Sequence, residues 1–256
     1  MTQRRFTGER LHEGDALFGV DLARHRAAYE FARPMLHGLR AVELGCGSGH
    51  GTASLGDAAA LLCGVDRVAP DRASRTARAR YLRADLRRLP IREKSFDIAI
   101  SFQVIEHLED PGLLVRALAR CLHPGGVALV STPNVRMSDG VNPYHVREYA
   151  ADELAACLRQ GFGEVEVLGV GMTPAVRAYM AARSARIQRI VKLDPLRLRE
   201  RLPRALVLRL FAAFALLVRR RTAASEGAPD ASVADFPIET ARDDAIDWLA
   251  LCRRPR

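Results

Sequence analysis

The chain has 256 residues, 48% of them hydrophobic, which is enough for one sizeable core with at most a small appended unit. Its formal charge of +9 comes almost entirely from arginine in an alanine-rich chain, since Lys94 and Lys192 are the only lysines. We attribute this bias to a GC-rich genome, so it is weak support for a nucleic-acid partner. Residues 1–15 lack the apolar segment of a signal peptide. Five scattered cysteines exclude a paired disulfide framework and indicate a reducing cytosol.

Short apolar runs alternate with helical patterns along most of the chain. The runs predict seven strands, at 40–44, 61–66, 81–84, 96–101, 127–132, 165–169 and 246–252. The clearest helical patterns cover 112–122 and 150–160. The apolar runs are nearly continuous, as in strands covered on both faces. The alternation therefore predicts a doubly wound α/β sheet.

The alternation of strand and helix patterns is interrupted towards the end of the chain. We expect N-terminal cap helices at 1–39, a core made of 40–172 and 238–256, and a helical insertion at 173–237. The insertion ends in TAASEGAPDASVAD, which is typical of a flexible connection.

Within the insertion, residues 203–221 read PRALVLRLFAAFALLVRRR, which is apolar nearly all round and too short to span a bilayer comfortably. A helix buried against the core or in a dimer contact is the favoured interpretation, because such helices are the commoner cause of apolar runs. The alternative is an interfacial helix whose arginines face lipid headgroups.

Residues 42–52 read VELGCGSGHGT, a glycine-rich turn directly after the first strand. The dinucleotide fingerprint G-x-G-x-x-G needs a glycine where His50 stands, and the phosphate loop needs a lysine that is missing here. What remains is E-x-G-x-G-x-G, from Glu43 to Gly49. By itself this pattern is also compatible with a tight turn that binds nothing.

The pattern resembles motif I of the class I S-adenosylmethionine-dependent methyltransferases. Strings on the next strands extend the resemblance: LLCGVDRV, RADLRRLP and, most specifically, KSFDIAISFQVIEHLEDP at 94–111. The resemblance implies a seven-stranded Rossmann-like sheet with its last strand antiparallel. It also implies that S-adenosyl-L-methionine binds across the glycine turn and the following strand ends, at Glu43, Gly45, Gly47, Gly49, Asp66, Asp85, Leu86 and Gln103.

These residues have distinct expected roles. Asp66 would accept hydrogen bonds from both ribose hydroxyls, as the acidic residue of dinucleotide folds does. Asp85 and Leu86 match the adenine contacts of the family, and Gln103 would lie near the methionyl part. The glycines would let the backbone approach the cofactor where a side chain would fill its space.

Transfer of a methyl group to an alcohol needs a general base, because the alcohol is hardly ionised at neutral pH. Two histidines follow the fourth and fifth strands, at the edge where open α/β sheets bind ligands. His145 lies in the long loop STPNVRMSDGVNPYHVREY and is the preferred base, with a loop-packing role as its alternative. His107 is a second candidate, although a helix-start or cofactor-wall residue is the favoured interpretation for it.

The acceptor is predicted from three further strings: FTGER at 6–10, RHRAAYEFA at 24–32 and NPYHVREYAADEL at 142–154. They resemble bacterial glycan O-methyltransferases of the methylmannose-polysaccharide type. The resemblance implies a sugar hydroxyl of a glycan or lipid-linked saccharide as acceptor. We therefore expect a cytoplasmic enzyme of polysaccharide biosynthesis, and a lipid-linked acceptor would suit peripheral contact with the inner membrane face through 203–221.

Other functions stay open. The first alternative is a methyltransferase of a quinone or other small lipophilic molecule. Nucleic-acid methylation is disfavoured because SFQV stands where such enzymes carry N-P-P-Y. Two further alternatives are less favoured: a cofactor-binding fold without transfer activity and a nicotinamide oxidoreductase. No spacing indicates a metal site, although Glu106 or Asp139 could join one, and no pattern indicates the oligomeric state.

Overall fold

The computed structural model describes residues 16–192 and 204–256, which form two compact units. The sheet unit consists of residues 25–137, 146–171 and 238–256. The helical unit consists of the described residues of 1–24, 138–145 and 172–237. The string FTGER at 6–10 and residues 193–203 of the expected insertion lie outside the described residues.

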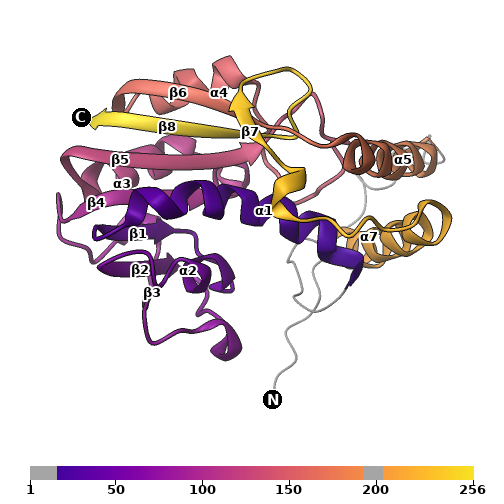
Figure 1. The fold of residues 1–256 in the computed structure, drawn as a ribbon. Coiled ribbons are helices and arrows are strands. Elements are labelled where there is room, and N and C mark those ends of the chain that lie inside the picture. Colours follow the sequence, from indigo (N-terminus) through magenta and orange to yellow (C-terminus); the bar gives the residue numbers. More distant parts are fainter. Residues whose placement is uncertain (1–15, 193–203) are drawn as a thin grey trace. The chain divides into compact units, whose positions relative to one another are not determined.

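The sheet unit contains one mixed sheet with the strand order β3-β2-β1-β4-β5-β8-β6-β7 (Figure 1). Strands β1 to β5 run parallel to one another, whereas β8 is antiparallel to β5 and β6, and β7 is antiparallel to β6. The strands are β1 Arg40–Leu44, β2 Leu61–Asp66, β3 Arg80–Arg83, β4 Phe96–Phe102, β5 Leu122–Pro133, β6 Phe162–Val170, β7 Ile238–Thr240 and β8 Asp247–Pro255.

The α/β class of the sequence analysis is confirmed, but the sheet has eight strands where seven were expected. The additional strand is β7, which has only three residues, IET, and pairs along one edge with β6. A segment this short carries no recognisable alternation of apolar and polar residues. Pairing with β6 is what makes it a strand.

The strand order reverses at β1, which lies between β2 and β4. In open α/β sheets, ligands bind outside the carboxyl ends of the strands at such a reversal. The core beneath it is built from nearly continuous buried strands, with Leu44, Ile100 and Trp248 among its fully buried side chains. The Trp248 indole donates a hydrogen bond of 2.9 Å to the carbonyl of Tyr149.

Helices α2 His50–Ser54, α3 Pro111–Cys121 and α4 Ala151–Leu158 belong to the sheet unit. Helix α3 begins with Pro111, whose missing amide is tolerated in a first helical turn, and it buries Leu114, Val115 and Leu118. The spacing of these three residues places them on one face of the helix, which explains why the sequence pattern predicted it.

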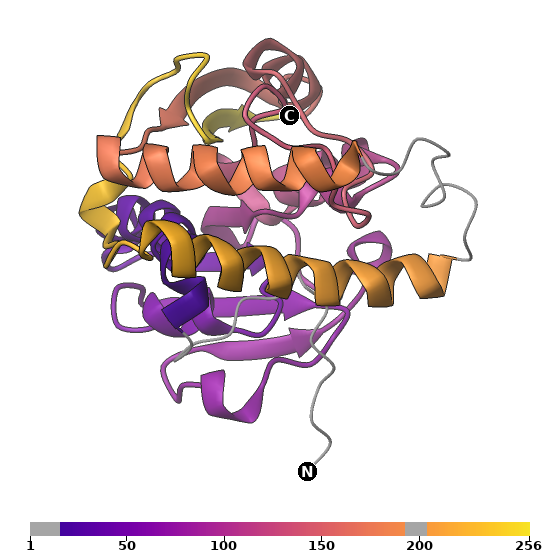
Figure 2. The same cartoon turned by 90° about the vertical axis from the view of Figure 1, so that its right-hand side faces the viewer.

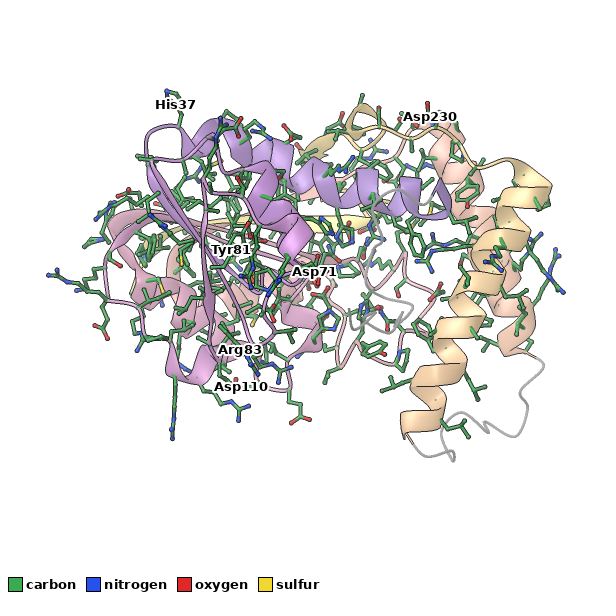
Figure 3. The ribbon with its side chains drawn as sticks, turned by 90° about the horizontal axis from the view of Figure 1, so that it is seen from below. His37, Asp71, Tyr81, Arg83, Asp110 and Asp230 are labelled. Carbon is green, nitrogen blue, oxygen red and sulfur yellow. The ribbon has the colours of Figure 1, made fainter. Side chains whose placement is uncertain are left out.

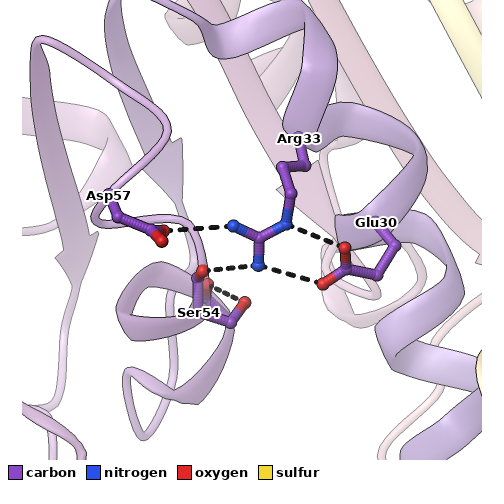
Figure 4. Close-up of polar contacts among 5 residues, drawn as sticks. Glu30, Arg33, Ser54 and Asp57 are labelled. Atoms are coloured by element: carbon purple, nitrogen blue, oxygen red, sulfur yellow. Dashed lines mark hydrogen bonds and ion pairs between the residues drawn. The ribbon is translucent and has the colours of Figure 1, made fainter.

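Helix α1 (Gly19–Ala32) leads into the sheet unit, and Arg33 fixes its end to helix α2 (Figure 4). The Arg33 guanidinium donates to both oxygens of Glu30, to the Ser54 carbonyl at 2.7 Å and to Asp57 at 3.1 Å. Because α2 follows the glycine turn, this arginine couples the position of α1 to that turn.

The helical unit contains α5 Pro174–Val191 and α7 Arg204–Glu226, which pack against each other (Figure 2). The helical unit also contains Asp21, which is only 5% exposed. Its carboxylate accepts hydrogen bonds from Arg183 on both oxygens at 3.0 Å and from Arg219 Nε at 3.1 Å. Burial alone would raise the pKa of Asp21, but Arg183 and Arg219 outweigh it and hold that pKa well below its usual range.

Helix α7 departs from the expectation at its end. The segment 222–226, expected to begin the flexible connection, continues the helix. Its first residue, Thr222, is fully buried and donates its hydroxyl to the Val218 carbonyl one turn earlier, and alanine favours helix in the residues that follow. None of the described helices is long and apolar enough to cross a membrane.

Candidate active site

The glycine turn leaves β1 at its carboxyl end. The amides of Gly45 and Cys46 both donate to the Val65 carbonyl of β2, at 2.7 and 3.1 Å. Gly45, Gly47 and Gly49 have φ values of 88°, 54° and 91°, a region that side-chain-bearing residues rarely adopt. The turn therefore depends on glycine for its backbone course.

The three glycines differ in what surrounds them. A Cβ at Gly45 would collide with Val104, and one at Gly49 would lie 2.9 Å from Pro70. A Cβ at Gly47 would meet no heavy atom within 4 Å. Neighbouring side chains thus exclude larger residues at the two ends of the turn, whereas the backbone at Gly47 borders open space that a ligand can occupy.

Asp66, at the end of β2, holds the centre of the turn. Its Oδ2 accepts the Gly47 amide at 2.9 Å and its Oδ1 accepts the Val68 amide at 2.8 Å. A carboxylate offers about four acceptor positions, so both oxygens can accept further hydrogen bonds from ligand hydroxyls. The open space at Gly47 and this carboxylate beside it fit an adenosyl group whose ribose carries two neighbouring hydroxyls.

Glu43 lies beneath the turn and is fully buried. Its Oε1 accepts the Tyr29 hydroxyl at 2.6 Å, and its Oε2 accepts the Thr52 hydroxyl. Burial raises the pKa of Glu43, since its desolvation outweighs the two hydroxyl donors. The structure thus places Glu43 where it links β1, α1 and α2 through hydrogen bonds.

Tyr29 was not singled out from the sequence, although it stands in the string RHRAAYEFA. Its ring fills the space that a Cβ at Gly51 would need, and it packs edge-on against Phe102 with the ring centroids 4.9 Å apart. Burial and the adjoining Glu43 raise the pKa of the Tyr29 hydroxyl well above its usual value. The fourth glycine of the turn is therefore explained by a tyrosine 22 residues earlier in the chain.

On its other side the turn is bordered by residues that follow β2 (Figure 3). The Asp71 amide donates to the Ser48 carbonyl at 3.0 Å. The Tyr81 ring of β3 would lie 3.3 Å from a Cβ at Gly49, and its hydroxyl donates to the Ser74 carbonyl at 3.3 Å. These contacts hold the outer part of the turn.

Asp85 and Leu86 follow β3. The Asp85 carboxylate caps the short turn Leu86–Arg88, because its Oδ1 accepts the Arg87 amide at 2.9 Å. This backbone hydrogen bond lowers the pKa of Asp85, and the Arg87 guanidinium adds to the effect. Leu86 is partly buried and packs against the core. The Asp85 carboxylate thus caps this turn, and the hydrogen bond orients it.

Gln103 lies directly after β4 with φ at 55°, one of the few non-glycine residues in this region. Its amide donates to the Ser131 carbonyl of β5 at 2.9 Å, which holds the unfavourable conformation in place. Strained backbone of this kind clusters at functional sites. Gln103 is partly exposed at the strand end.

The two histidines occupy different units. His107 ends the short turn Ile105–His107 of the sheet unit, with its Nε2 3.9 Å from Oε1 of the buried Glu106. His145 belongs to the helical unit, where it is partly exposed and its amide donates to the Asn142 carbonyl at 3.2 Å. The cofactor residues predicted from the sequence all lie in the sheet unit.

The chain that follows His145 returns to the sheet unit at the end of β4. The amides of Val146 and Arg147 both donate to the Glu106 carbonyl, at 2.8 and 3.2 Å. Glu106 is itself held by Thr132 of β5, whose hydroxyl donates to its Oε2 at 3.0 Å. No local pattern reveals this link, because Glu106 stands about 40 residues before the segment that its carbonyl anchors.

Comparison with known proteins agrees with this geometry. A family model described as a methyltransferase domain matches residues 42–130. A probable S-adenosylmethionine-dependent methyltransferase of Mycolicibacterium smegmatis is 40% identical over 175 residues, covering 64% of this chain and 67% of that protein. A ubiquinone biosynthesis O-methyltransferase of Rhizobium etli is 30% identical over 144 residues, or 54% and 56% of the two chains.

Among solved structures, an S-adenosylmethionine-dependent methyltransferase of Thermotoga maritima matches with a TM-score of 0.58 at 15% identity, covering 93% of this chain and 92% of that chain. At such low identity the match establishes the fold alone. The sequence relatives and the family model establish more: the chain belongs to the class I S-adenosylmethionine-dependent methyltransferases and uses S-adenosyl-L-methionine as its methyl donor.

Proposed function

We propose that this methyltransferase acts on a hydroxyl of a sugar, in a glycan or a lipid-linked saccharide, with His145 as the general base. The observation that carries the proposal is the anchoring of Val146 and Arg147 on the Glu106 carbonyl. It ties the segment that begins directly after His145 to the end of β4, next to the strained Gln103. A base in the preceding loop is then connected to the strand end at which ligands of this fold bind.

The residues of the sheet unit would hold the cofactor, which supplies an activated methyl group on a sulfonium. Asp66 accepts from the ribose hydroxyls, Asp85 and the Leu86 amide contact the adenine, and Gln103 lies near the methionyl part. Gly47 would leave the backbone open to the cofactor, Gly45 and Gly49 would permit the course of the turn, and Glu43 would support it from beneath.

In the proposed reaction, the acceptor oxygen bonds to the methyl carbon while the carbon–sulfur bond breaks and its electron pair stays on sulfur. The hydroxyl proton passes to the imidazole of His145, so charge and atoms balance. Holding the acceptor in line with the breaking bond supplies much of the acceleration. We assign His107 to the wall of the site rather than to proton transfer.

A ring hydroxyl of a quinone precursor or similar lipophilic molecule is the second candidate, favoured by the relative named as a ubiquinone biosynthesis O-methyltransferase. A phenol ionises near pH 10, as tyrosine does, and far more readily than a sugar hydroxyl. Loss of the base should therefore reduce methylation of a sugar more than methylation of a phenol.

The test uses isotope-labelled S-adenosylmethionine, the purified full chain and an extract of the producing cells, divided into aqueous glycan and organic lipid fractions. His145→Ala, His107→Ala and the control His123→Ala are compared, since His123 pairs with Asp97 at the amino end of β4, far from the glycine turn along that strand. Cofactor affinity is measured for each by calorimetry.

We expect label in saccharide, lost by at least 100-fold in His145→Ala alone, with cofactor affinity unchanged. Label confined to a lipid without sugar would replace the first candidate by the second. An equal loss of methyl transfer in His145→Ala and His123→Ala would contradict the assignment of His145 as the base.

A further inference from the structure

Helix α7 presents two opposite faces. One face is buried, with Ala212, Ala215, Val218 and Thr222 between 0% and 9% exposed. The other face carries large apolar side chains in the open: Leu206 is 41% exposed, Leu210 53% and Leu217 44%. An apolar helix interior to the protein would not leave three leucines half exposed.

The exposed leucines form one line. Leu206, Leu210, the exposed Ala213 and Leu217 are separated by four, three and four residues, which keeps them on one side of a helix. From the rise of 1.5 Å per residue, the line is about 16 Å long. We call these four residues the leucine stripe.

Two arginines follow the leucine stripe along the helix. Arg220 and Arg221 are exposed, and by the helical repeat of 100° per residue they point to either side of the line that the stripe follows. The sequence from 204 to 225 contains no aspartate or glutamate. Arg219, in contrast, points to the buried side, where it pairs with Asp21. Glu226, the last residue of α7, is exposed but lies half a turn from Leu217, so the face with the leucine stripe combines apolar and positive side chains.

We propose that this face of α7 docks the protein on the surface of an anionic lipid bilayer. Leucines entering the boundary of the acyl chains and arginines at the headgroups are the two contributions that bind interfacial helices. Charge complementarity selects this occupant over a second copy of the chain, because a second copy would present the same exposed cations. The helix lies on the membrane and does not cross it, which agrees with its hydropathy.

The proposal does not depend on the identity of the acceptor. It deepens the proposed function in one respect, since an enzyme bound along α7 would meet acceptors that are anchored in the same leaflet. Its test reads binding to lipid and not methyl transfer, so failure of either proposal leaves the other intact.

The test is flotation of the purified full chain with vesicles of phosphatidylcholine alone or with 30% phosphatidylglycerol added, a fraction chosen as roughly that of an anionic bacterial leaflet. We compare wild type with Leu206→Gln/Leu210→Gln and with Arg220→Gln/Arg221→Gln. The matched controls in the sheet unit are Leu39→Gln/Leu61→Gln, whose leucines are 37% and 40% exposed, and Arg78→Gln/Arg92→Gln, whose arginines are exposed.

We expect binding to the anionic vesicles only, weakened by salt. Each arginine near an anionic surface changes affinity about fivefold, so the double arginine variant should lose about 25-fold. The double leucine variant should lose at least about tenfold, and both control pairs should bind like wild type. Cofactor affinity should be the same in all five proteins, which shows that each is folded.

Three results would overturn the proposal. The first is no flotation of wild type with anionic vesicles, and the second is an equal loss in the control pairs. The third is a wild-type dimer in solution, measured by light scattering, that the leucine variant converts to monomer without any lipid binding by either protein. That result would make the leucine stripe a contact between copies.

Discussion

The sheet unit and the helical unit bury carboxyl groups in opposite ways. In the sheet unit, burial raises the pKa of Glu43, because its two hydroxyl donors offset only part of the desolvation. In the helical unit, the buried Asp21 is paired with two arginines, so its pKa is lowered. The first arrangement supports a turn that must stay open to a ligand, while the second clamps helices together.

The two units use their carboxylates for different purposes. Around the glycine turn, one carboxylate accepts from backbone amides and the other from hydroxyls of helices α1 and α2, and the backbone at Gly47 stays accessible. In the helical unit the carboxylate pairs with two arginines that hold the helices together, and the surface proposed to bind lipid is the exposed side of α7. Substitutions in the two units should therefore separate effects on stability from effects on binding.

The largest effect is expected from Asp21→Asn. It leaves the guanidinium groups of Arg183 and Arg219 buried without their partner, which typically costs about 3–5 kcal/mol. Hydrogen exchange should show that amides of α5 and α7 lose protection, whereas those of β1 and β4 keep it. The exposed Asp230→Asn serves as control (Figure 3). Equal loss of protection throughout both units would contradict a local role.

The same carboxylate predicts a dependence on pH. The folded pKa of Asp21 lies below its ordinary value of 3.8, so the stabilisation is complete above that value. It should be lost progressively as the pH falls further towards the folded pKa. Asp21→Asn should therefore flatten the acid limb of a stability profile measured by denaturant unfolding between pH 2 and 7 in steps of about one unit.

Next in size is Asp66→Ala, which removes the acceptor of the Gly47 amide and the proposed acceptor of the ribose hydroxyls. Hydrogen bonds to a charged group contribute about 1.5–3 kcal/mol each, so the loss of two should weaken cofactor binding by about 100-fold or more. Calorimetric titration with S-adenosylmethionine measures the change, with the exposed Glu93→Ala as control. Unchanged affinity would remove Asp66 from the proposed site.

Gly47→Ala and Gly38→Ala form a matched pair. Both glycines have positive φ, 54° and 71°, and at neither would a Cβ meet a heavy atom within 4 Å. Both substitutions should lower the free energy of unfolding similarly, by about 1–2 kcal/mol. Only Gly47→Ala should weaken cofactor binding, by at least about tenfold, because its methyl group enters the space left for the ligand. Equal affinity in both variants would show that the ligand lies elsewhere.

An effect on stability alone is expected from Tyr29→Phe, which keeps the ring against Gly51 and Phe102 but removes one donor from Glu43. An unsatisfied buried acceptor costs about 1–3 kcal/mol. The donor favours the ionised form of Glu43, so its removal should raise the pKa of Glu43 further. Tyr81→Phe, whose hydroxyl donates to a backbone carbonyl at 3.3 Å, is the control.

The pH dependence of Tyr29→Phe follows from the sign of that shift. When a folded pKa exceeds the ordinary value of 4.5, the folded state keeps a proton that the unfolded state releases, so stability declines as the pH rises between the two values. The deficit of Tyr29→Phe relative to wild type should therefore grow from pH 4 to pH 8. Thermal unfolding across that range measures it, and a constant deficit would mean that Glu43 does not titrate there.

Much of the sheet unit could be predicted from local pattern. The bounds of β1 and β2 agree with the expected segments, and the others differ by a few residues, because buried parallel strands appear as continuous apolar runs. The glycines at 45, 47 and 49 were recognisable because their conformation requires glycine wherever the turn occurs. Asp66 could also be placed from the sequence, because it directly ends an apolar run that forms β2.

The sequence by itself thus determined the order of every strand except β7, the glycine turn and the family to which they belong. Only the tertiary structure decided that Tyr29 supports Glu43, that Glu106 anchors the chain after His145, and that Asp21 pairs with arginines 162 and 198 residues away. It also decided which side of α7 is exposed. These features depend on contacts between distant segments, and no local periodicity records which segments will pack together.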